Sequence, residues 1–138
     1  MMDTILVYVA QIDEEKQIVK PHIAAIPKED HLEDMYRLLN CSLVDARTIF
    51  MDKQRFVIWF DDEFLLKNAP LYPTFWLYDY EQPLCGNYMI TKEGEDGETV
   101  GLTKEEALFV HKWILKHQHD MADKTISFIK SCRHEQTA

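Results

Sequence analysis

The sequence contains little glycine, which is found at only four of its 138 positions. Most phosphate-binding loops depend on glycine-rich backbone to approach their ligand, so the chain lacks the usual means of building a nucleotide-phosphate cradle. It also lacks a GxSxG motif and an HExxH motif. These absences favour a non-enzymatic protein, and they leave no catalytic residue and no cofactor to assign.

Cysteine is also scarce, with only Cys41, Cys85 and Cys132. Three cysteines do not form an even disulfide set and none belongs to a CxxC pair, so we expect reduced thiols that serve as small apolar residues. No apolar run approaches the roughly 20 residues of a membrane span, and the N-terminus has no basic leader followed by a small-residue cleavage site. We therefore expect a soluble, cytoplasmic protein with no membrane partner.

Positive charge is in short supply, because 15 basic side chains stand against 24 acidic ones and give a net charge of −9. Such a charge disfavours attraction to a phosphate backbone, so we expect no direct binding to nucleic acid. Basic protein surfaces would be attracted instead. Imitation of DNA by the acidic side chains is a further interpretation, although an ordinary acidic protein has the same net charge.

The strongest strand pattern lies in segment 55–68, RFVIWFDDEFLLKN. Residues 56–60 form a continuous apolar run that ends in charge, which is typical of a central strand covered on both faces. The acidic residues Asp61, Asp62 and Glu63 follow directly. They form a candidate binding surface that could take a divalent cation, but three adjacent carboxylates rarely converge on one ion, so a solvated turn is the favoured interpretation.

An aromatic segment follows, in which Pro73 precedes a strand predicted over 74–80, TFWLYDY. Alternation along a strand would place Trp76, Tyr78 and Tyr80 on one face. Together with Tyr72, these residues form the second part of the candidate binding surface, because aromatic residues with polar tips are common at interfaces. The competing interpretation is that a helix covers them as part of the core.

The remaining pattern predicts a single α+β domain over residues 1–138, with a mostly antiparallel sheet of five to six strands. A short amphipathic helix is expected over 28–40, ending at Asn40. Thr103 and Glu106 form a capping box that begins a long C-terminal helix packed on the sheet. The polar stretch 116–120 favours a kink or break near His119, after which Asp120 would cap a second helix.

The other strands are expected at 4–12, 18–26, 43–51, 55–60, 84–92 and 99–102. The strand at 18–26 is expected to be short or to lie at an edge because of Pro21, and the one at 84–92 to contain a bulge at Gly86. A turn of about three residues is expected to join 43–51 to 55–60.

The C-terminal segment also contains His117, His119 and Asp123, which raise the question of a metal site. On a helix only His119 and Asp123 share a face, so this segment offers two ligands at most. Structural zinc requires four ligands, so a polar hinge in a helix is the favoured interpretation and no metal ligand is assigned.

Four segments stand in a familiar order and spacing: 5–7 (ILV), 31–46 (HLEDMYRLLNCSLVDA), 57–68 (VIWFDDEFLLKN) and 84–103 (LCGNYMITKEGEDGETVGLT). They resemble a domain-of-unknown-function family of small proteins encoded by bacteriophages, prophages and other mobile elements. The resemblance covers about residues 4–106 and leaves 107–133 as a helical extension. The chain departs from the family pattern at Asn40, Cys41 and Phe64, where glycine is usual. The resemblance implies a mobile-element origin and an accessory role, but no activity.

The leading hypothesis is therefore a non-enzymatic phage or mobile-element protein that acts by binding a host protein. A first alternative is a sponge that sequesters a small nucleotide in a pocket lined by Trp76, Tyr78 and Tyr80. A second alternative, the least favoured, is a metal-assisted hydrolase that uses the C-terminal histidines. An apolar, self-complementary stripe on the C-terminal helix would favour a homodimer.

Overall fold

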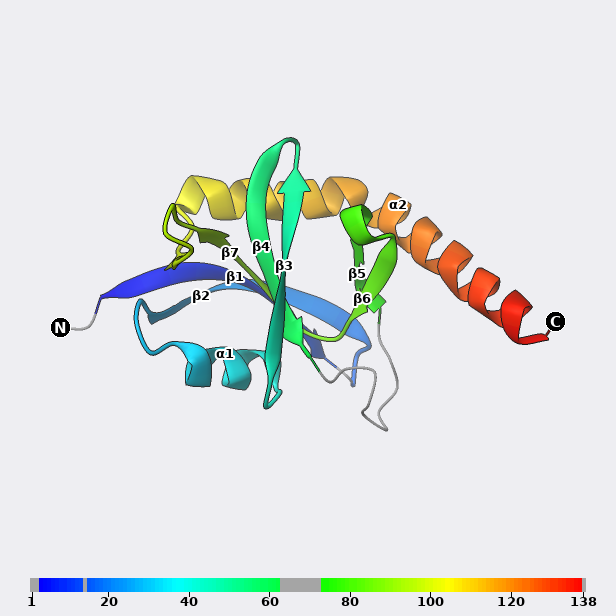
Figure 1. Cartoon of the computed structure of the whole chain (residues 1–138), viewed down its shortest axis with the longest axis horizontal. Helices are drawn as coiled ribbons and strands as arrows, with labels where there is room; N and C mark the ends of the chain where they lie inside the picture. Colours follow the sequence, from blue (N-terminus) through cyan, green and yellow to red (C-terminus); the bar gives the residue numbers. More distant parts are fainter. Residues whose placement is uncertain (1–2, 14, 63–72, 138) are drawn as a thin grey trace.

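The computed structural model of the chain describes residues 3–13, 15–62 and 73–137, with side chains as far as Cys132. Its elements confirm the predicted α+β class (Figure 1). In chain order they are β1 (Thr4–Asp13), β2 (Ile18–Pro27), α1 (Leu32–Leu39), β3 (Val44–Met51), β4 (Gln54–Asp61), β5 (Pro73–Leu77), the 3-10 turn η1 (Tyr78–Tyr80), β6 (Gln82–Cys85), β7 (Tyr88–Glu93), β8 (Thr99–Val100) and α2 (Lys104–Thr137).

The main sheet is antiparallel and has the strand order β2-β1-β7-β4-β3, with β8 paired to β7. Strands β5 and β6 form a separate two-stranded sheet. Figure 1 shows α2 crossing one side of the main sheet and α1 lying on the other. The two faces accordingly bury two clusters: a larger one with α2, β5 and β6, and a smaller one with α1.

Strand β4 lies inside the sheet, between β7 and β3, as the apolar run 56–60 predicts. Phe56 and Ile58 are buried in the larger cluster, while Trp59 packs against the smaller one. The Trp59 Nε1–H group donates to Thr91 Oγ1 at 2.9 Å, so the polar atoms of this pair are satisfied. Both faces of the strand are therefore covered, which explains why its sequence does not alternate.

The prediction that the second strand is short or lies at an edge is confirmed in its second form, whereas the predicted turn between β3 and β4 needs correction. Strand β2 does lie at an edge, but it is not short: it pairs with β1 over all ten residues, with Pro21 opposite Ala10. The hairpin between β3 and β4 closes with only two residues, Asp52 and Lys53, and not with about three. Both have positive φ, 49° and 71°, which is the backbone of a type I′ turn whose twist matches that of the flanking strands.

The segment predicted as one strand over 84–92 is two strands in different sheets. The chain leaves β6 at Cys85, passes through Gly86 and Asn87, and enters β7 at Tyr88. Gly86 has φ +91°, a conformation that is costly for other residues, so its role is a change of direction and not the predicted bulge. The Asn87 side chain fixes the junction, because its Oδ1 accepts from Ile12 N–H at 2.8 Å and its amide donates to the Leu39 carbonyl at 3.3 Å.

Helix α2 begins with the predicted capping box. Glu106 N–H donates to Thr103 Oγ1 at 3.0 Å, and Thr103 N–H donates to Glu106 Oε1 at 2.9 Å. The helix then runs unbroken for 34 residues, so the predicted second helix capped by Asp120 is wrong. The polar stretch interrupts nothing because it contains neither proline nor glycine and its side chains are mainly exposed. Figure 1 shows a change of direction along α2, after which the helix extends past the sheet, so of the predicted kink or break it is the kink that the structure shows.

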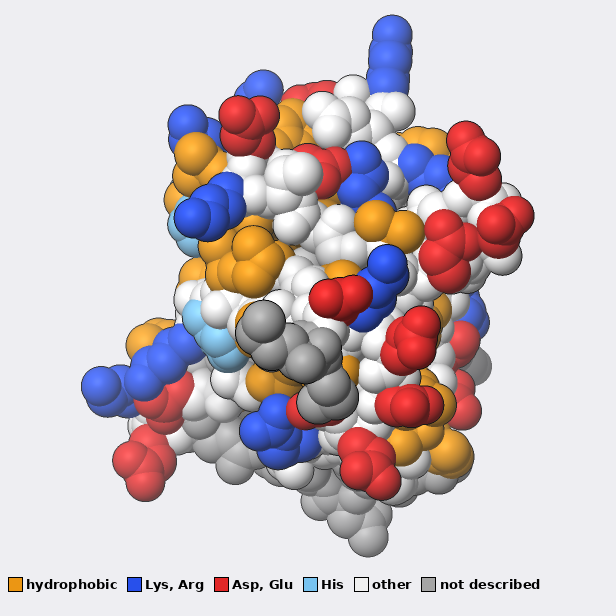
Figure 2. Space-filling view, turned by 90° about the vertical axis from the view of Figure 1, so that its left-hand side faces the viewer, with side chains coloured by type: hydrophobic (Ala, Val, Ile, Leu, Met, Phe, Trp, Pro, Cys, Tyr) orange, Lys and Arg blue, Asp and Glu red, His pale blue; other side chains and the backbone are white. Residues whose placement is uncertain are grey.

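The surface is mixed in character. Figure 2 shows acidic side chains over much of one end of the molecule, with lysine and arginine between them and hydrophobic side chains in small separate areas. None of the described helices combines the length and hydrophobicity that crossing a membrane requires.

Candidate functional site

The predicted aromatic strand ends earlier than its sequence indicates. Strand β5 stops at Leu77, and Tyr78 begins the η1 turn, which leads through Glu81 (φ 49°) into β6. The expected common face of Trp76, Tyr78 and Tyr80 is therefore wrong, because a strand alternates only while it remains extended. Trp76 is buried, Tyr78 is half-buried and Tyr80 is exposed.

Trp76 packs between the small sheet and the second half of α2. Its ring meets the Phe128 ring edge-on at 6.1 Å between centroids, and its backbone N–H points at Met121 Sδ at 3.4 Å. Only 7% of the residue is exposed, so Trp76 serves mainly as core and forms one wall of the surface beside it. For this residue the interpretation of a covering helix is confirmed.

Tyr78 joins η1 to α2 through a polar contact. Its hydroxyl donates to Asp120 Oδ2 at 2.5 Å, while its ring lies edge-on to Trp113 at 6.0 Å. Burial, followed by the hydrogen bond and the negative charge of Asp120, raises the pKa of Tyr78 above its usual value. The Lys124 Nζ atom lies 6.0 Å from the centre of the Tyr78 ring, so this ring already faces a cation.

These residues border an open groove, which we call the α2 groove, with a volume of about 580 Å³. Its charged groups are three carboxylates and one ammonium group, which together carry a net charge of −2. Its aromatic members come from β5, η1 and α2. The described lining residues are Trp76, Tyr78, Glu81, Asp120, Asp123, Lys124, Ser127, Phe128 and Ser131. Carboxylates beside aromatic rings suit an ammonium or guanidinium group.

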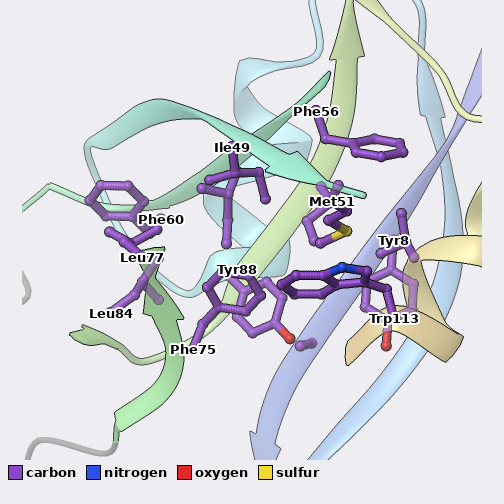
Figure 3. Close-up of a cluster of buried hydrophobic side chains, with 14 of the residues drawn as sticks. Tyr8, Ile49, Met51, Phe56, Phe60, Phe75, Leu77, Leu84, Tyr88 and Trp113 are labelled. Atoms are coloured by element: carbon purple, nitrogen blue, oxygen red, sulfur yellow. The ribbon is translucent and has the colours of Figure 1, made fainter. Parts of the chain in front are cut away.

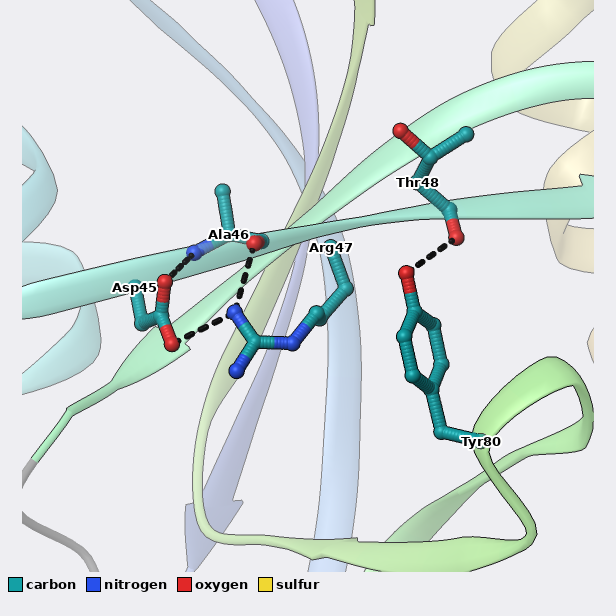
Figure 4. A network of polar contacts seen from close by, with 5 residues as sticks. All are labelled: Asp45, Ala46, Arg47, Thr48 and Tyr80. Carbon is teal, nitrogen blue, oxygen red and sulfur yellow. Dashed lines mark hydrogen bonds and ion pairs between the residues drawn. The ribbon is translucent and has the colours of Figure 1, made fainter.

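Tyr80 lies elsewhere, over the edge strand β3 (Figure 4). Its hydroxyl lies 3.5 Å from the Thr48 carbonyl oxygen, and the Arg47 guanidinium lies 5.9 Å from the centre of its ring. Arg47 also forms an ion pair with Asp45 at 2.6 Å. Tyr80 therefore covers part of a sheet edge and is absent from the α2 groove lining.

The acidic end of β4 is not one solvated turn. Asp61 is still part of β4, opposite Val44, and only 8% of it is exposed. Asp62 is exposed, and its N–H donates to the Leu43 carbonyl at 3.0 Å. The expectation of a solvated exit is therefore wrong for Asp61 and confirmed for Asp62, and neither lines the α2 groove. Glu63 and Tyr72, the remaining members of the predicted surface, lie outside the described residues.

His111 and His117 each contact a different aromatic residue. His117 stacks on Trp113 at 3.9 Å and hydrogen-bonds through Nδ1 to the Trp113 carbonyl at 2.8 Å. His111 Nδ1 lies 2.9 Å from the Tyr8 hydroxyl. Among the described residues, no group of three or more His, Cys, Asp or Glu side chains is placed to hold a metal ion.

The contribution of α2 to the groove was not among the predictions from the sequence. Asp120, Lys124, Ser127 and Ser131 recur at spacings of three and four residues, so a polar stripe on this helix was readable from the sequence. What the sequence did not reveal was that η1, about 40 residues earlier in the chain, would lie against this stripe. That juxtaposition depends on the fold of β5 and β6 over α2.

The fold and the groove define a small α+β protein with an acidic, aromatic-lined surface between a short hairpin and a long helix. The chain belongs to the family described as "Domain of unknown function (DUF3846)", which matches residues 7–115. The predicted resemblance to a domain-of-unknown-function family is thus confirmed. No curated protein and no solved structure matches the chain. Glu81 and the aromatic residues of the hairpin lie within the matched range, whereas every α2 residue of the groove lies beyond it.

Proposed function

We propose that this chain is a non-enzymatic phage or mobile-element protein that binds a host protein, and that the α2 groove receives a lysine- or arginine-containing segment of that partner. The observation that carries the proposal is the convergence of Glu81, Asp120 and Asp123 with three aromatic rings in one open groove. This arrangement matches the two main ways in which proteins recognise a cationic side chain, ion pairing and contact with an aromatic face.

The charge of the molecule supports the same partner chemistry. The groove has a net charge of −2, and the whole chain has a net charge of −9. The field would therefore draw a basic segment toward the groove at low and moderate salt. Lys124 is a guide to the bound state, since its ammonium group already lies over the Tyr78 ring.

The two alternatives receive no support from a specific observation. A nucleotide pocket built from Trp76, Tyr78 and Tyr80 would need all three on one surface, but Tyr80 lies over β3 and three carboxylates border the other two. Carboxylates repel phosphate groups. A metal-assisted hydrolase would need ligands that converge on one ion, but His111 and His117 have separate partners, and no group of three or more candidate ligands is found among the described residues. Both remain predictions from the sequence alone.

The test is affinity purification of the full chain from a bacterial host at near-physiological salt, followed by mass spectrometry and measurement of the affinity of the recovered partner. The informative variant is Glu81→Gln/Asp123→Asn, which removes two charges from the groove and leaves the Tyr78–Asp120 hydrogen bond in place. We expect binding to weaken by about three- to tenfold, because exposed ion pairs contribute modestly.

The matched control is Glu95→Gln/Asp96→Asn, which removes two charges from the exposed turn between β7 and β8. This variant should bind as the wild type does. Recovery of no stable partner would contradict the proposal, and so would equal weakening by both double variants, since that result would indicate net charge and not the groove.

A further inference from the structure

A second hollow lies on the other side of α2, between the helix and strands β1, β2, β5 and β7. We call it the β1–α2 cavity; its volume is about 490 Å³. Much of its wall is aliphatic, with Ala10 and Val19 on the sheet side and Ile114, Leu115, Ala122 and Ile126 on the helix side. It shares no described lining residue with the α2 groove. Its size and composition are those of sites that hold small, largely apolar ligands.

The wall of the cavity also contains hydrogen-bonding groups from buried tyrosines. Tyr8 and Tyr88 are 3% and 2% exposed, and both line the cavity. The Tyr8 hydroxyl pairs with His111 Nδ1 at 2.9 Å. Figure 3 shows the two tyrosine hydroxyl oxygens on the same side of the buried cluster. Burial raises the pKa of Tyr8 to about 12 and also raises the pKa of Tyr88, so both hydroxyls keep their protons at neutral pH.

The described wall of the cavity has no charged side chain that could form an ion pair with a charged ligand. Its described lining contains no lysine, arginine, aspartate or glutamate, and His111 is its only titratable group apart from the tyrosines. Moving an ionised head group into such a wall costs far more free energy than moving a hydroxyl or carbonyl group that finds a hydrogen-bond partner. The composition of the wall therefore selects for an uncharged ligand.

We propose that the β1–α2 cavity binds an uncharged amphiphile, whose apolar chain lies between α2 and the sheet and whose single hydroxyl or carbonyl group hydrogen-bonds with Tyr8 and Tyr88. The protein would thus carry a small-molecule site in addition to the α2 groove. This inference does not depend on the proposed function, because it rests on a different wall of α2 and on different residues.

The test compares three probes that share one chain and differ in charge: 1-octanol, octanoate and octylammonium. Binding to the full chain is measured by displacement of Nile red fluorescence and by the shift in melting temperature at neutral pH. We expect 1-octanol to bind at least about tenfold more tightly than either ion, because an ionised head group placed against the buried Tyr8 and Tyr88 would lose part of its hydration without gaining an oppositely charged partner.

Two tryptophan variants locate the site, and a third variant tests the head-group contact. Ala122→Trp places a large ring at the cavity wall from an exposed helix position, and it should weaken 1-octanol binding at least about tenfold by filling the space. Lys116→Trp adds the same ring at an exposed position outside the described lining and should leave binding unchanged. Tyr8→Phe, with its fold checked by circular dichroism, should weaken 1-octanol binding about two- to tenfold through loss of one hydrogen bond.

Three results would overturn the inference. The first is the absence of 1-octanol binding to the wild type, and the second is tighter binding of octanoate or octylammonium than of 1-octanol. The third is an equal effect of the two tryptophan variants, which would place the probe outside the cavity. Unchanged 1-octanol affinity in folded Tyr8→Phe would overturn the assignment of the head-group contact.

Discussion

At position 101 the close approach of strand β1 leaves room for glycine only. A Cβ atom at this position would come within 2.6 Å of Ile5 Cβ and 3.0 Å of Leu6 N. The next residue, Leu102, donates its N–H to the Leu6 carbonyl at 2.8 Å. Only a residue without a side chain lets the chain approach β1 this closely just before α2 begins.

We expect Gly101→Ala to destabilise the protein by about 1–3 kcal/mol, because the added methyl group must push apart two backbone segments joined by a hydrogen bond. The free energy of unfolding from urea denaturation measures the effect. Val100→Ala is the control, since Val100 is an exposed neighbour and its truncation should cost no more than about 0.5 kcal/mol. A Gly101→Ala protein as stable as the control would contradict this explanation.

The candidate site shows what residue-level reasoning from the sequence can reach. The aromatic richness of 74–80 drew attention to Trp76 and Tyr78, and the structure places both at the α2 groove, whose role as a binding site is a proposal. It failed for Tyr80, because alternation was extended across a turn that begins at Tyr78. The partner of Tyr78 is Asp120, 42 residues later, and no local pattern connects two residues so far apart.

Among the elements, α2 has the clearest sequence signal for the residue at which it begins, a capping box. The reciprocal hydrogen bonds of Thr103 and Glu106 satisfy backbone N–H groups that the first turn would otherwise leave free. Glu106 also pairs with Lys92 of β7, which ties the helix start to the sheet. Burial alone would raise the pKa of Glu106, but its hydrogen bonds with Lys92 and Thr103 outweigh burial and lower it.

Thr103→Ala should therefore cost about 1 kcal/mol of stability, the usual effect of removing an N-cap oxygen. Thr103→Ser keeps that oxygen and should stay close to the wild type. Urea denaturation of the three proteins at neutral pH measures the difference. If alanine and serine lowered the free energy of unfolding equally, the hydroxyl hydrogen bond would not be the cause.

The elements also show where sequence prediction stops. The helix start was predictable because a capping box is contained in four residues. Its unbroken course was not, because the polar stretch 116–120 is compatible both with a break and with an exposed part of one helix. Segment 84–92 has the composition of one strand, yet β6 and β7 pair with different partners. Composition indicates that a segment is extended, but it does not say which strand it will join.

For the molecule as a whole, the class and the two-sided burial of β4 followed from the sequence, but the strand order did not. Strand β7 lies between β1 and β4, although about 75 residues separate β1 from β7 in the chain. Pairing over such distances depends on how all the apolar faces pack together. The sequence carries no short-range pattern for it.

We expect the free energy of unfolding of the whole molecule to decrease at high pH. The pKa values of Tyr8, Tyr78 and Tyr88 are all raised in the folded protein, Tyr8 to about 12. An unfolded tyrosine ionises near pH 10, so above this pH the unfolded chain releases protons that the folded chain retains. Stability from these residues is therefore present below about pH 10 and is lost as the pH rises toward 12.

Urea midpoints measured from pH 9 to 12 should fall, and the fall should be shallower for Tyr8→Phe, which lacks one of the three groups. Tyrosinate absorbance recorded in parallel should rise with unfolding. A pH dependence identical in the wild type and Tyr8→Phe would contradict the linkage, because lysine ionisation is common to both proteins.

Because the chain changes sheet at Gly86, the β5–β6 hairpin is joined to the rest of the fold differently from the strands of the main sheet. Strands β5 and β6 share backbone hydrogen bonds with each other and not with the main sheet, and they are held by side-chain packing on α2 and the core. The position of the hairpin therefore depends on side-chain packing, and Phe75, Leu77 and Leu84 are almost fully buried in the larger cluster. Because Trp76 belongs to the hairpin and Tyr78 to the turn that closes it, one wall of the α2 groove is held in place by this side-chain packing and not by the backbone ladder of the main sheet.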